Sequence, residues 1–277
     1  MNRKLVFLDI DGTLVAAMSR PSPLAAKAVC RARENGHKVL LCTGRNMPII
    51  GNDIMAVGFD GVIASAGSHV EVEGEVLFDR ILPEETIQEC LTVFHDQGMF
   101  CRIESPEGIY TDPQMETLLR ETQADETNSE LIRMQKEIEL GIPILPYEKY
   151  PGKGAYKICF TSTSQEAIDN SRKYLQDRFV FAVHPYREGG SCLNGEIIPK
   201  GTDKSSGMKL VCQHYGMEVK DTVAFGDSMN DYEMMSYAGV SVAMGNACRE
   251  IKEMADVVCG SVQEDGIYYE FKRMGLL

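Results

Sequence analysis

Short apolar runs and longer amphipathic segments alternate along the first part of the chain. The apolar runs predict buried strands at residues 4–8, 38–42 and 61–65. Residues 23–34 and 47–57 have helical spacing, and Ser22 and Gly36 are the expected cap and stop of the first helix. Because buried strands separated by helices are typical of parallel βα units, the pattern predicts a doubly wound, mainly parallel α/β sheet.

The end of the chain returns to this alternation, while the middle departs from it. Near the end, strands are predicted at 221–225, 240–243 and 257–258 and a helix at 230–237, and a hairpin is predicted earlier, at 69–78. The middle of the chain mixes helices with strands. Helices are predicted at 84–96 and 165–176, and strands at 100–103, 156–161 and 179–183. We expect an α/β core at 1–82 and 191–277, interrupted by an inserted α+β cap domain at 83–190.

Charge changes this picture in two places. The acidic stretch 116–139 predicts two helices whose charged faces lie in solvent. Over the whole chain, 28 lysines and arginines stand against 41 acids, a formal net charge of −13. That balance argues against a nucleic-acid partner and against an anionic membrane, and no apolar run is long enough to span a bilayer. The nine cysteines are scattered without a CxxC pair, which favours reduced thiols in a cytoplasmic protein.

Polar residues follow three of the predicted strands at the point where each strand ends. Asp9 and Asp11 follow the first strand, Thr43-Gly44-Arg45 follows the second, and 226–231 follows a strand near the end of the chain. The carboxyl ends of parallel strands share one edge of a sheet, so we expect these clusters to converge there. Clustered carboxylates repel unless a cation intervenes, and hard oxygen ligands favour Mg²⁺. Each cluster alone is equally explained as a turn or a helix cap.

The same residues resemble a known family. Asp9-Ile10-Asp11-Gly12-Thr13-Leu14 resembles the DxDGT signature of the haloacid dehalogenase superfamily. Residues 226–235, 238–239 and 243–247 are similar to the fourth motif of its Cof-type hydrolase branch. The resemblance covers 1–82 and 191–277, and the insertion resembles that branch's large C2-type cap in position, length and mixture of helices and strands.

The resemblance implies a Mg²⁺-dependent phosphatase that acts through an aspartyl-phosphate. Asp9 is then the nucleophile, and Asp11 is the acid that protonates the leaving oxygen and the base that activates water. The metal is expected on the carboxylates of Asp9 and Asp227 and the main-chain carbonyl of Asp11, with Asp231 supporting the shell. The residues implied in phosphate binding are Ile10, Thr43, Gly44, Lys204 and Asn230.

Two positions depart from the family pattern. Ser205 follows Lys204 where relatives usually have glycine, although the spacing still favours Lys204 over Lys200 as the phosphate-binding lysine. Ala66-Gly67 stands where relatives often have asparagine-glycine, which removes a side-chain phosphate contact from position 66. Arg45 is open to two interpretations, a substrate contact or a pair with a surface acid. His184 ends a predicted strand of the insertion and is the one histidine of interest there.

Two other functions remain open from sequence. A sugar phosphomutase of the same superfamily shares the first motif and the position of the cap, and a non-catalytic regulatory or binding protein can be built on this fold. The expected partner is a small phosphorylated metabolite, whether a sugar, nucleotide or cofactor phosphate. The sequence does not choose among these substrates, and it leaves the oligomeric state, monomer or dimer, open.

Overall fold

The fold is taken from a computed structural model, which describes residues 3–16, 19–122, 129–139, 142–183 and 193–277. The chain divides into two compact units. Unit 1 comprises Met1–Arg45, Ile50–Asp79 and Thr202–Leu277, and unit 2 comprises Asn46–Ile49 and Arg80–Gly201. Residues 193–201, which the sequence assigned to the core, thus lie in unit 2, because the strand they form pairs with strands of that unit.

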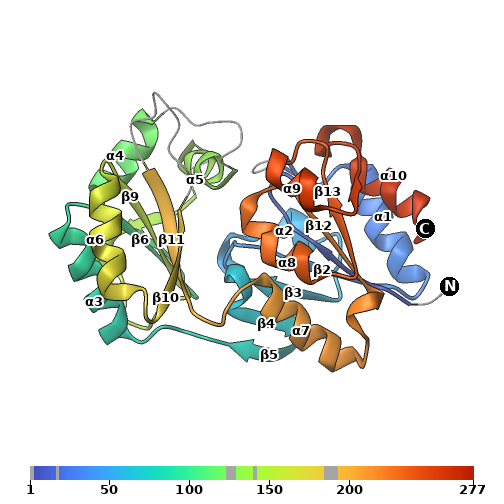
Figure 1. The fold of residues 1–277 in the computed structure, drawn as a ribbon, viewed down its shortest axis with the longest axis horizontal. Helices are drawn as coiled ribbons and strands as arrows, with labels where there is room; N and C mark the ends of the chain where they lie inside the picture. The colour runs from blue at the N-terminus through green and yellow to red at the C-terminus, as the bar shows by residue number, and fades with distance from the viewer. Residues whose placement is uncertain (1–2, 17–18, 123–128, 140–141, 184–192) are drawn as a thin grey trace. The chain divides into compact units, whose positions relative to one another are not determined.

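The sheet of unit 1 confirms the predicted doubly wound α/β fold. Its strand order is β14-β13-β12-β1-β2-β3-β4-β5. The strands are β1 Leu5–Leu8, β2 Lys38–Cys42, β3 Gly61–Ala64, β4 His69–Val72, β5 Glu75–Asp79, β12 Thr222–Gly226, β13 Val240–Ala243 and β14 Val257–Val258. All neighbours pair in parallel except β3, β4 and β5, whose pairings with one another are antiparallel. In each central strand, alternate residues point to opposite faces of the sheet. Helices cover both faces (Figure 1).

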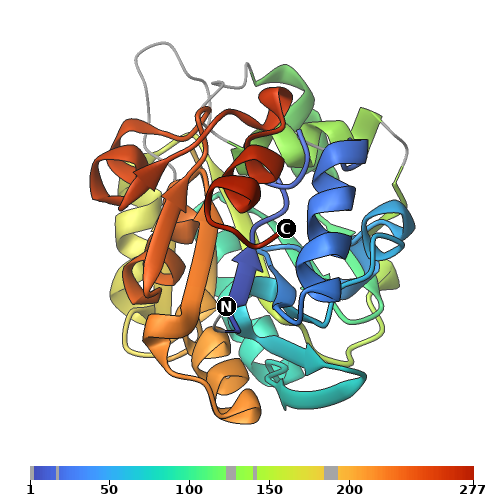
Figure 2. The ribbon, with the colours of Figure 1, turned by 90° about the vertical axis from the view of Figure 1, so that its right-hand side faces the viewer.

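The helices of unit 1 form where the sequence provides caps and apolar faces. They are α1 Pro23–Glu34, α2 Asn52–Met55, α7 Lys204–Tyr215, α8 Tyr232–Tyr237, α9 Arg249–Met254 and α10 Gly266–Arg273. Ser22 caps α1 as predicted, by accepting a hydrogen bond from the Ala25 amide. Figure 2 shows α1 and α10 side by side against the sheet, while α7 and α8 pack on its other face.

One predicted helix is broken. Residues 47–57 form a 3-10 turn at Met47–Ile49 and the short helix α2, instead of one continuous helix. Gly51, between them, has extended backbone angles (φ −59°, ψ 147°), so the helical hydrogen bonds cannot run through it. The first of these pieces belongs to unit 2 and the second to unit 1.

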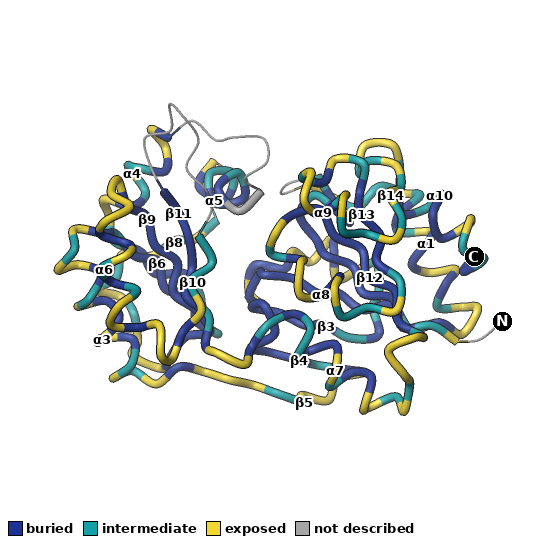
Figure 3. The backbone as a smooth tube through the Cα atoms, viewed as in Figure 1, coloured by how far each residue is buried: buried dark blue, intermediate teal, exposed yellow. Residues whose placement is uncertain are grey.

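Unit 2 is an α+β unit built on a second sheet, of strand order β10-β11-β9-β6-β7-β8. Its strands are β6 Phe100–Ser105, β7 Gly108–Thr111, β8 Ile144–Pro146, β9 Lys157–Ser162, β10 Phe179–Val183 and β11 Leu193–Pro199. Its helices are α3 Glu84–Asp96, α4 Pro113–Glu121, α5 Ser129–Glu139 and α6 Gln165–Leu175. Helices α3 and α6 bury one face of the sheet in an apolar core, and Figure 3 shows strands such as β6, β9 and β11 as buried.

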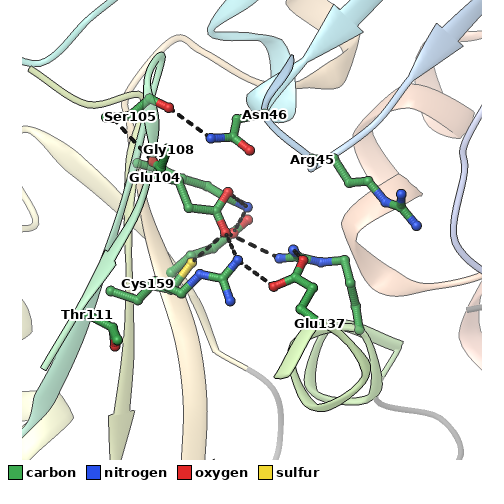
Figure 4. Close-up of polar contacts among 12 residues, drawn as sticks. Arg45, Asn46, Glu104, Ser105, Gly108, Thr111, Glu137 and Cys159 are labelled. Atoms are coloured by element: carbon green, nitrogen blue, oxygen red, sulfur yellow. Dashed lines mark hydrogen bonds and ion pairs between the residues drawn. The ribbon is translucent and has the colours of Figure 1, made fainter. Parts of the chain in front are cut away.

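The opposite face of this sheet carries buried charges beside a smaller apolar cluster formed with α4 and α5. The acidic stretch forms two helices as predicted, α4 and α5, but Arg133 and Glu137 of α5 are fully buried. They join Arg102 and Glu104 of β6: Arg102 Nη2 lies 2.7 Å from Glu137 Oε2, and Arg133 Nη2 lies 3.4 Å from Glu104 Oε1. Figure 4 shows Glu104 and Glu137 within this network. The expectation of a solvated face was therefore wrong for α5, because these charges pair with the sheet.

No helix in the described part of the chain is long and apolar enough to cross a membrane.

Candidate active site

The candidate site lies where the strand order of unit 1 changes direction. The chain runs from β1 outward through β2 and β3 on one side, and through β12, β13 and β14 on the other. In open α/β sheets the crevice for ligands forms at this switch point, beyond the carboxyl ends of the strands. Asp9 follows β1 directly, Thr43 follows β2 and Asp227 follows β12. The predicted residues therefore start from adjacent strands at one sheet edge.

A tight loop after β1 fixes the nucleophile candidate. The Asp9 amide donates to the Phe225 carbonyl at 3.1 Å, which continues the parallel ladder into β12. Beyond it, the Ile10 carbonyl accepts from the Leu14 and Val15 amides at 3.0 and 2.9 Å, so the chain curls back on itself. Asp9 is 3% exposed and Ile10 fully buried. Their positions are thus set by backbone hydrogen bonds.

Lys204 joins two carboxylates across the site. Its ammonium donates to Asp9 Oδ1 at 2.7 Å and to Asp231 Oδ1 at 2.6 Å, and its side chain is 1% exposed. Lys204 is the first residue of α7, and the side chain of Asp203 caps that helix by accepting from the Ser206 amide. The structure brings the predicted lysine to the predicted nucleophile, 195 positions away in the sequence.

Asp231 also orders the loop that carries Asp227. Its second oxygen, Oδ2, accepts from the Asp227 and Ser228 amides at 2.9 and 3.2 Å. Asp227 itself accepts from the Thr13 hydroxyl at 3.3 Å, a contact that the sequence did not single out, although Thr13 belongs to the first motif. Gly12 lies against Asp227 so closely that no side chain fits between them.

The carboxylates form a group suited to a hard cation. Oxygens of Asp9, Asp227 and Asp231 all lie within 4.8 Å of one another, and all three residues are buried. Carboxylate oxygens in this number match the ligand preference of Mg²⁺. The Asp11 carboxylate is not a member of this group. Its main-chain carbonyl is the atom for which the sequence predicted a metal contact.

The electrostatics of the carboxylate group favour the binding of a cation. Burial, reinforced by the neighbouring Asp231 carboxylate, raises the pKa of Asp9 to about 8 despite the Lys204 ammonium. Burial and Asp231 likewise raise the pKa of Asp227 well above its ordinary value. Burial alone would lower the pKa of Lys204, but Asp231 and Asp9 outweigh it and raise that pKa. One ammonium among three buried carboxylates leaves the group short of positive charge.

The remaining predicted residues lie on the loops after β2 and β12. Thr43 and Gly44 are buried, and the Thr43 hydroxyl accepts from the Arg45 amide at 3.1 Å. Asn230 is half-buried and accepts from the Ser228 hydroxyl at 2.7 Å. His184 lies outside the described residues.

Arg45 is the residue whose partner the sequence left open. It pairs with Asp11, the predicted acid and base, and not with a surface acid. The only sequence signal was its place directly after Thr43-Gly44.

Comparisons with known proteins agree with this geometry. The model of the haloacid dehalogenase-like hydrolase family matches residues 6–271. YkrA of Bacillus subtilis, which is named as a phosphatase, is 30% identical over 278 residues and covers 100% of both chains. The HMP-PP phosphatase of Yersinia enterocolitica is 27% identical over 95% of this chain and 92% of its own. A solved sugar phosphatase of haloacid dehalogenase subclass IIB superposes with a TM-score of 0.77 at 25% identity, covering 99% of this chain and 100% of its own.

Proposed function

Because the chain belongs to the haloacid dehalogenase-like hydrolase family and is a phosphomonoesterase of its Cof-type branch, we propose a specific reaction. The protein hydrolyses phosphomonoesters of small metabolites, with Mg²⁺ bound and through an aspartyl-phosphate intermediate. The observation that carries this proposal is the buried Lys204 ammonium, which is shared between Asp9 and Asp231 within the carboxylate group.

In the first step, a carboxylate oxygen of Asp9 attacks phosphorus as the bond from phosphorus to the leaving oxygen breaks. Asp11 gives its proton to that oxygen, so the alcohol leaves neutral. In the second step, Asp11 takes a proton from water, and the water oxygen attacks the phosphorus of the aspartyl-phosphate. Inorganic phosphate leaves, and Asp9 is regenerated.

The metal would be held by the carboxylates of Asp9 and Asp227 and by the main-chain carbonyl of Asp11. When bound, it neutralises charge so that an anionic carboxylate can approach an anionic phosphate. Asp231 supports this shell through its hydrogen bonds to the amides of Asp227 and Ser228. The mutual placement of the three carboxylates supports the assignment.

The phosphate oxygens are assigned to the surrounding donors. The Thr43 hydroxyl accepts from the Arg45 amide, and this leaves its own hydrogen for a phosphate oxygen. The main-chain amides of Ile10 and Gly44 add neutral donors, Lys204 supplies positive charge, and Asn230 orients the phosphate. These donors offset the repulsion expected from a chain of net charge −13.

Unit 2 is proposed as the cap that selects the leaving group. Two relatives carry names for different substrates, HMP-PP and a sugar phosphate, so the fold serves more than one of them. We propose that the substrate is a sugar, nucleotide or cofactor phosphate, and that the protein acts without nucleic acid or membrane as a partner.

The test is a phosphate-release screen over a panel of metabolite phosphates with Mg²⁺. Asp9→Asn provides the blank, and Asp60→Asn, a buried aspartate at the opposite edge of the sheet, is the matched control. We expect release by the unaltered protein and by Asp60→Asn, and none by Asp9→Asn. A folded, metal-loaded sample that releases no phosphate from any member refutes the proposal. Conversion of a sugar phosphate to its isomer without release identifies a phosphomutase instead.

A further inference from the structure

A two-pronged ion pair joins Arg45 to Asp11. Arg45 Nε donates to Asp11 Oδ2 at 2.7 Å, and Nη2 donates to Oδ1 at 2.6 Å. Arg45 is 3% exposed and the Asp11 side chain 11% exposed. Two parallel bonds fix both the distance and the plane of a carboxylate, which a single contact does not. The direction of the Asp11 side chain is therefore set by one arginine.

The backbone of Arg45 is itself anchored on both sides. Its amide donates to the Thr43 hydroxyl at 3.1 Å, and its carbonyl accepts from the Ser65 amide at 2.8 Å. Ser65 and Ala66 both adopt positive φ angles, 49° and 53°, which L-residues rarely adopt. The Ala66 amide donates to the Thr43 carbonyl at 3.0 Å. Backbone strain in this loop thus accompanies the contacts that fix Arg45, a combination typical of functional sites.

The pair also explains why the Asp11 carboxylate stays outside the metal-binding group. Asp11 is only two residues from Asp9, yet its carboxylate is absent from the Asp9–Asp227–Asp231 cluster. Both of its oxygens face the guanidinium instead.

We propose that Arg45 is a positioning residue that holds the Asp11 carboxylate away from the metal-binding carboxylates, in place for proton transfer to and from the leaving group. This inference rests on the proposed role of Asp11. A positioning role for Arg45 differs from a purely structural ion pair in one measurable respect. If Arg45 positions Asp11, its loss impairs only the chemistry that depends on Asp11.

Leaving-group dependence separates the two roles. An alkyl phosphate needs protonation of its leaving oxygen, whereas 4-nitrophenyl phosphate releases a stable anion without it. The probes are glucose 6-phosphate, or the alkyl phosphate turned over fastest in the screen, and 4-nitrophenyl phosphate. Arg45→Lys keeps the positive charge but cannot form the two parallel hydrogen bonds to Asp11. Arg45→Gln loses both the charge and these paired bonds.

We expect Arg45→Lys to lower kcat/KM, which reports only the steps through departure of the leaving group, by about 100-fold for the alkyl phosphate, the loss typical of a misplacement of about 1 Å, and by less than about 10-fold for 4-nitrophenyl phosphate. Arg45→Gln should follow the same order with larger losses. In an Asp11→Asn background, Arg45→Lys should cause no further loss. The matched control is Arg33→Lys, which breaks another two-pronged pair, with Asp60, away from the site; it should leave the ratio of the two activities unchanged.

The inference is overturned if both Arg45 variants lose equal factors in activity toward the two substrates while their melting temperatures match that of Arg33→Lys. Additive losses in the Asp11→Asn background overturn it as well. An Asp11→Asn variant that lowers kcat/KM equally for both substrates overturns the proposed role of Asp11 as the acid, and the inference with it. The failure of the function and the failure of the positioning role are therefore read from different variants.

Discussion

Gly12 is the position where the geometry makes the sharpest demand on one residue. Its φ of +83° lies in the left-handed region, and a Cβ built there would lie 2.2 Å from Asp227 Oδ2 and 2.5 Å from Asp227 Cγ. Ordinary van der Waals contact begins at 3.4 Å, so Gly12→Ala must push the Asp227 carboxylate away by more than 1 Å. A misplacement of about 1 Å at a reacting centre costs about 100-fold in rate. The backbone adds about 1–2 kcal/mol of destabilisation.

The matched control is Gly36→Ala, because Gly36 has a similar φ of +88° and a Cβ at that position would meet nothing within 4 Å. Both variants should lose stability in urea unfolding through the backbone, and Gly12→Ala should lose at least as much as Gly36→Ala. Only Gly12→Ala should lose about 100-fold in kcat/KM and require more Mg²⁺ for half-maximal phosphate release. If the activity of Gly12→Ala stays within about three-fold of that of Gly36→Ala, the close packing on Asp227 does not hold a metal ligand in place.

Three further predictions concern stability. Burial alone would raise the pKa of Asp60, but hydrogen bonds from Arg33, Val39 and Lys38 outweigh it and lower that pKa. Asp60→Asn should therefore cost about 2 kcal/mol at pH 7; in urea titrations the difference should begin to shrink as the pH falls through about 4 and should vanish only below the lowered pKa of the folded state. Glu137→Gln in unit 2 should lower the free energy of unfolding by about 3–5 kcal/mol, because it leaves buried arginines short of negative charge. The control, Glu116→Gln, lies in an exposed pair and should cost under about 1 kcal/mol. Equal costs for the two variants contradict the burial of the network. Adding Mg²⁺ at about 100 times its Kd to a chelator-treated sample should stabilise it by about 2.7 kcal/mol, measured as a rise in Tm, and no rise refutes a metal site.

The sequence predicted those parts of the fold that depend on local pattern. The apolar runs indicated the central parallel strands because a strand buried on both faces has little choice of composition. Lys204 was indicated by the resemblance to the family, whose lysine opens a helix after a short loop, and the structure places its ammonium on Asp9. The cap of the first helix was also readable, since Ser22 followed by proline is a local signal.

What escaped the sequence depends on contacts between distant segments. The pairing of Arg45 with Asp11 joins two loops, and nothing in either loop specifies the other. The charges of α5 looked like a solvated face because their partners lie on a distant strand; Arg102, the partner of Glu137, is 35 residues earlier in the chain. Boundaries failed for the same reason: residues 193–199 have a strand pattern that fits either unit, and only their pairing with β9 and β10 decides between them.

The central position of β1 has a consequence for how the chain is made. One of its two neighbours, β12, is paired in register from Leu5 with Thr222, so synthesis must proceed by about 200 more residues before that neighbour exists. At typical ribosome speeds this takes about 10–40 s. During this time, unit 2, which is almost continuous in sequence, can complete its own contacts. The apolar strand β1 meanwhile lacks one of its two neighbouring strands. The pairing of β1 with β12 in the middle of the sheet can therefore form only late in synthesis, and the proposed nucleophile at the end of β1 gains its neighbours from β12 only then.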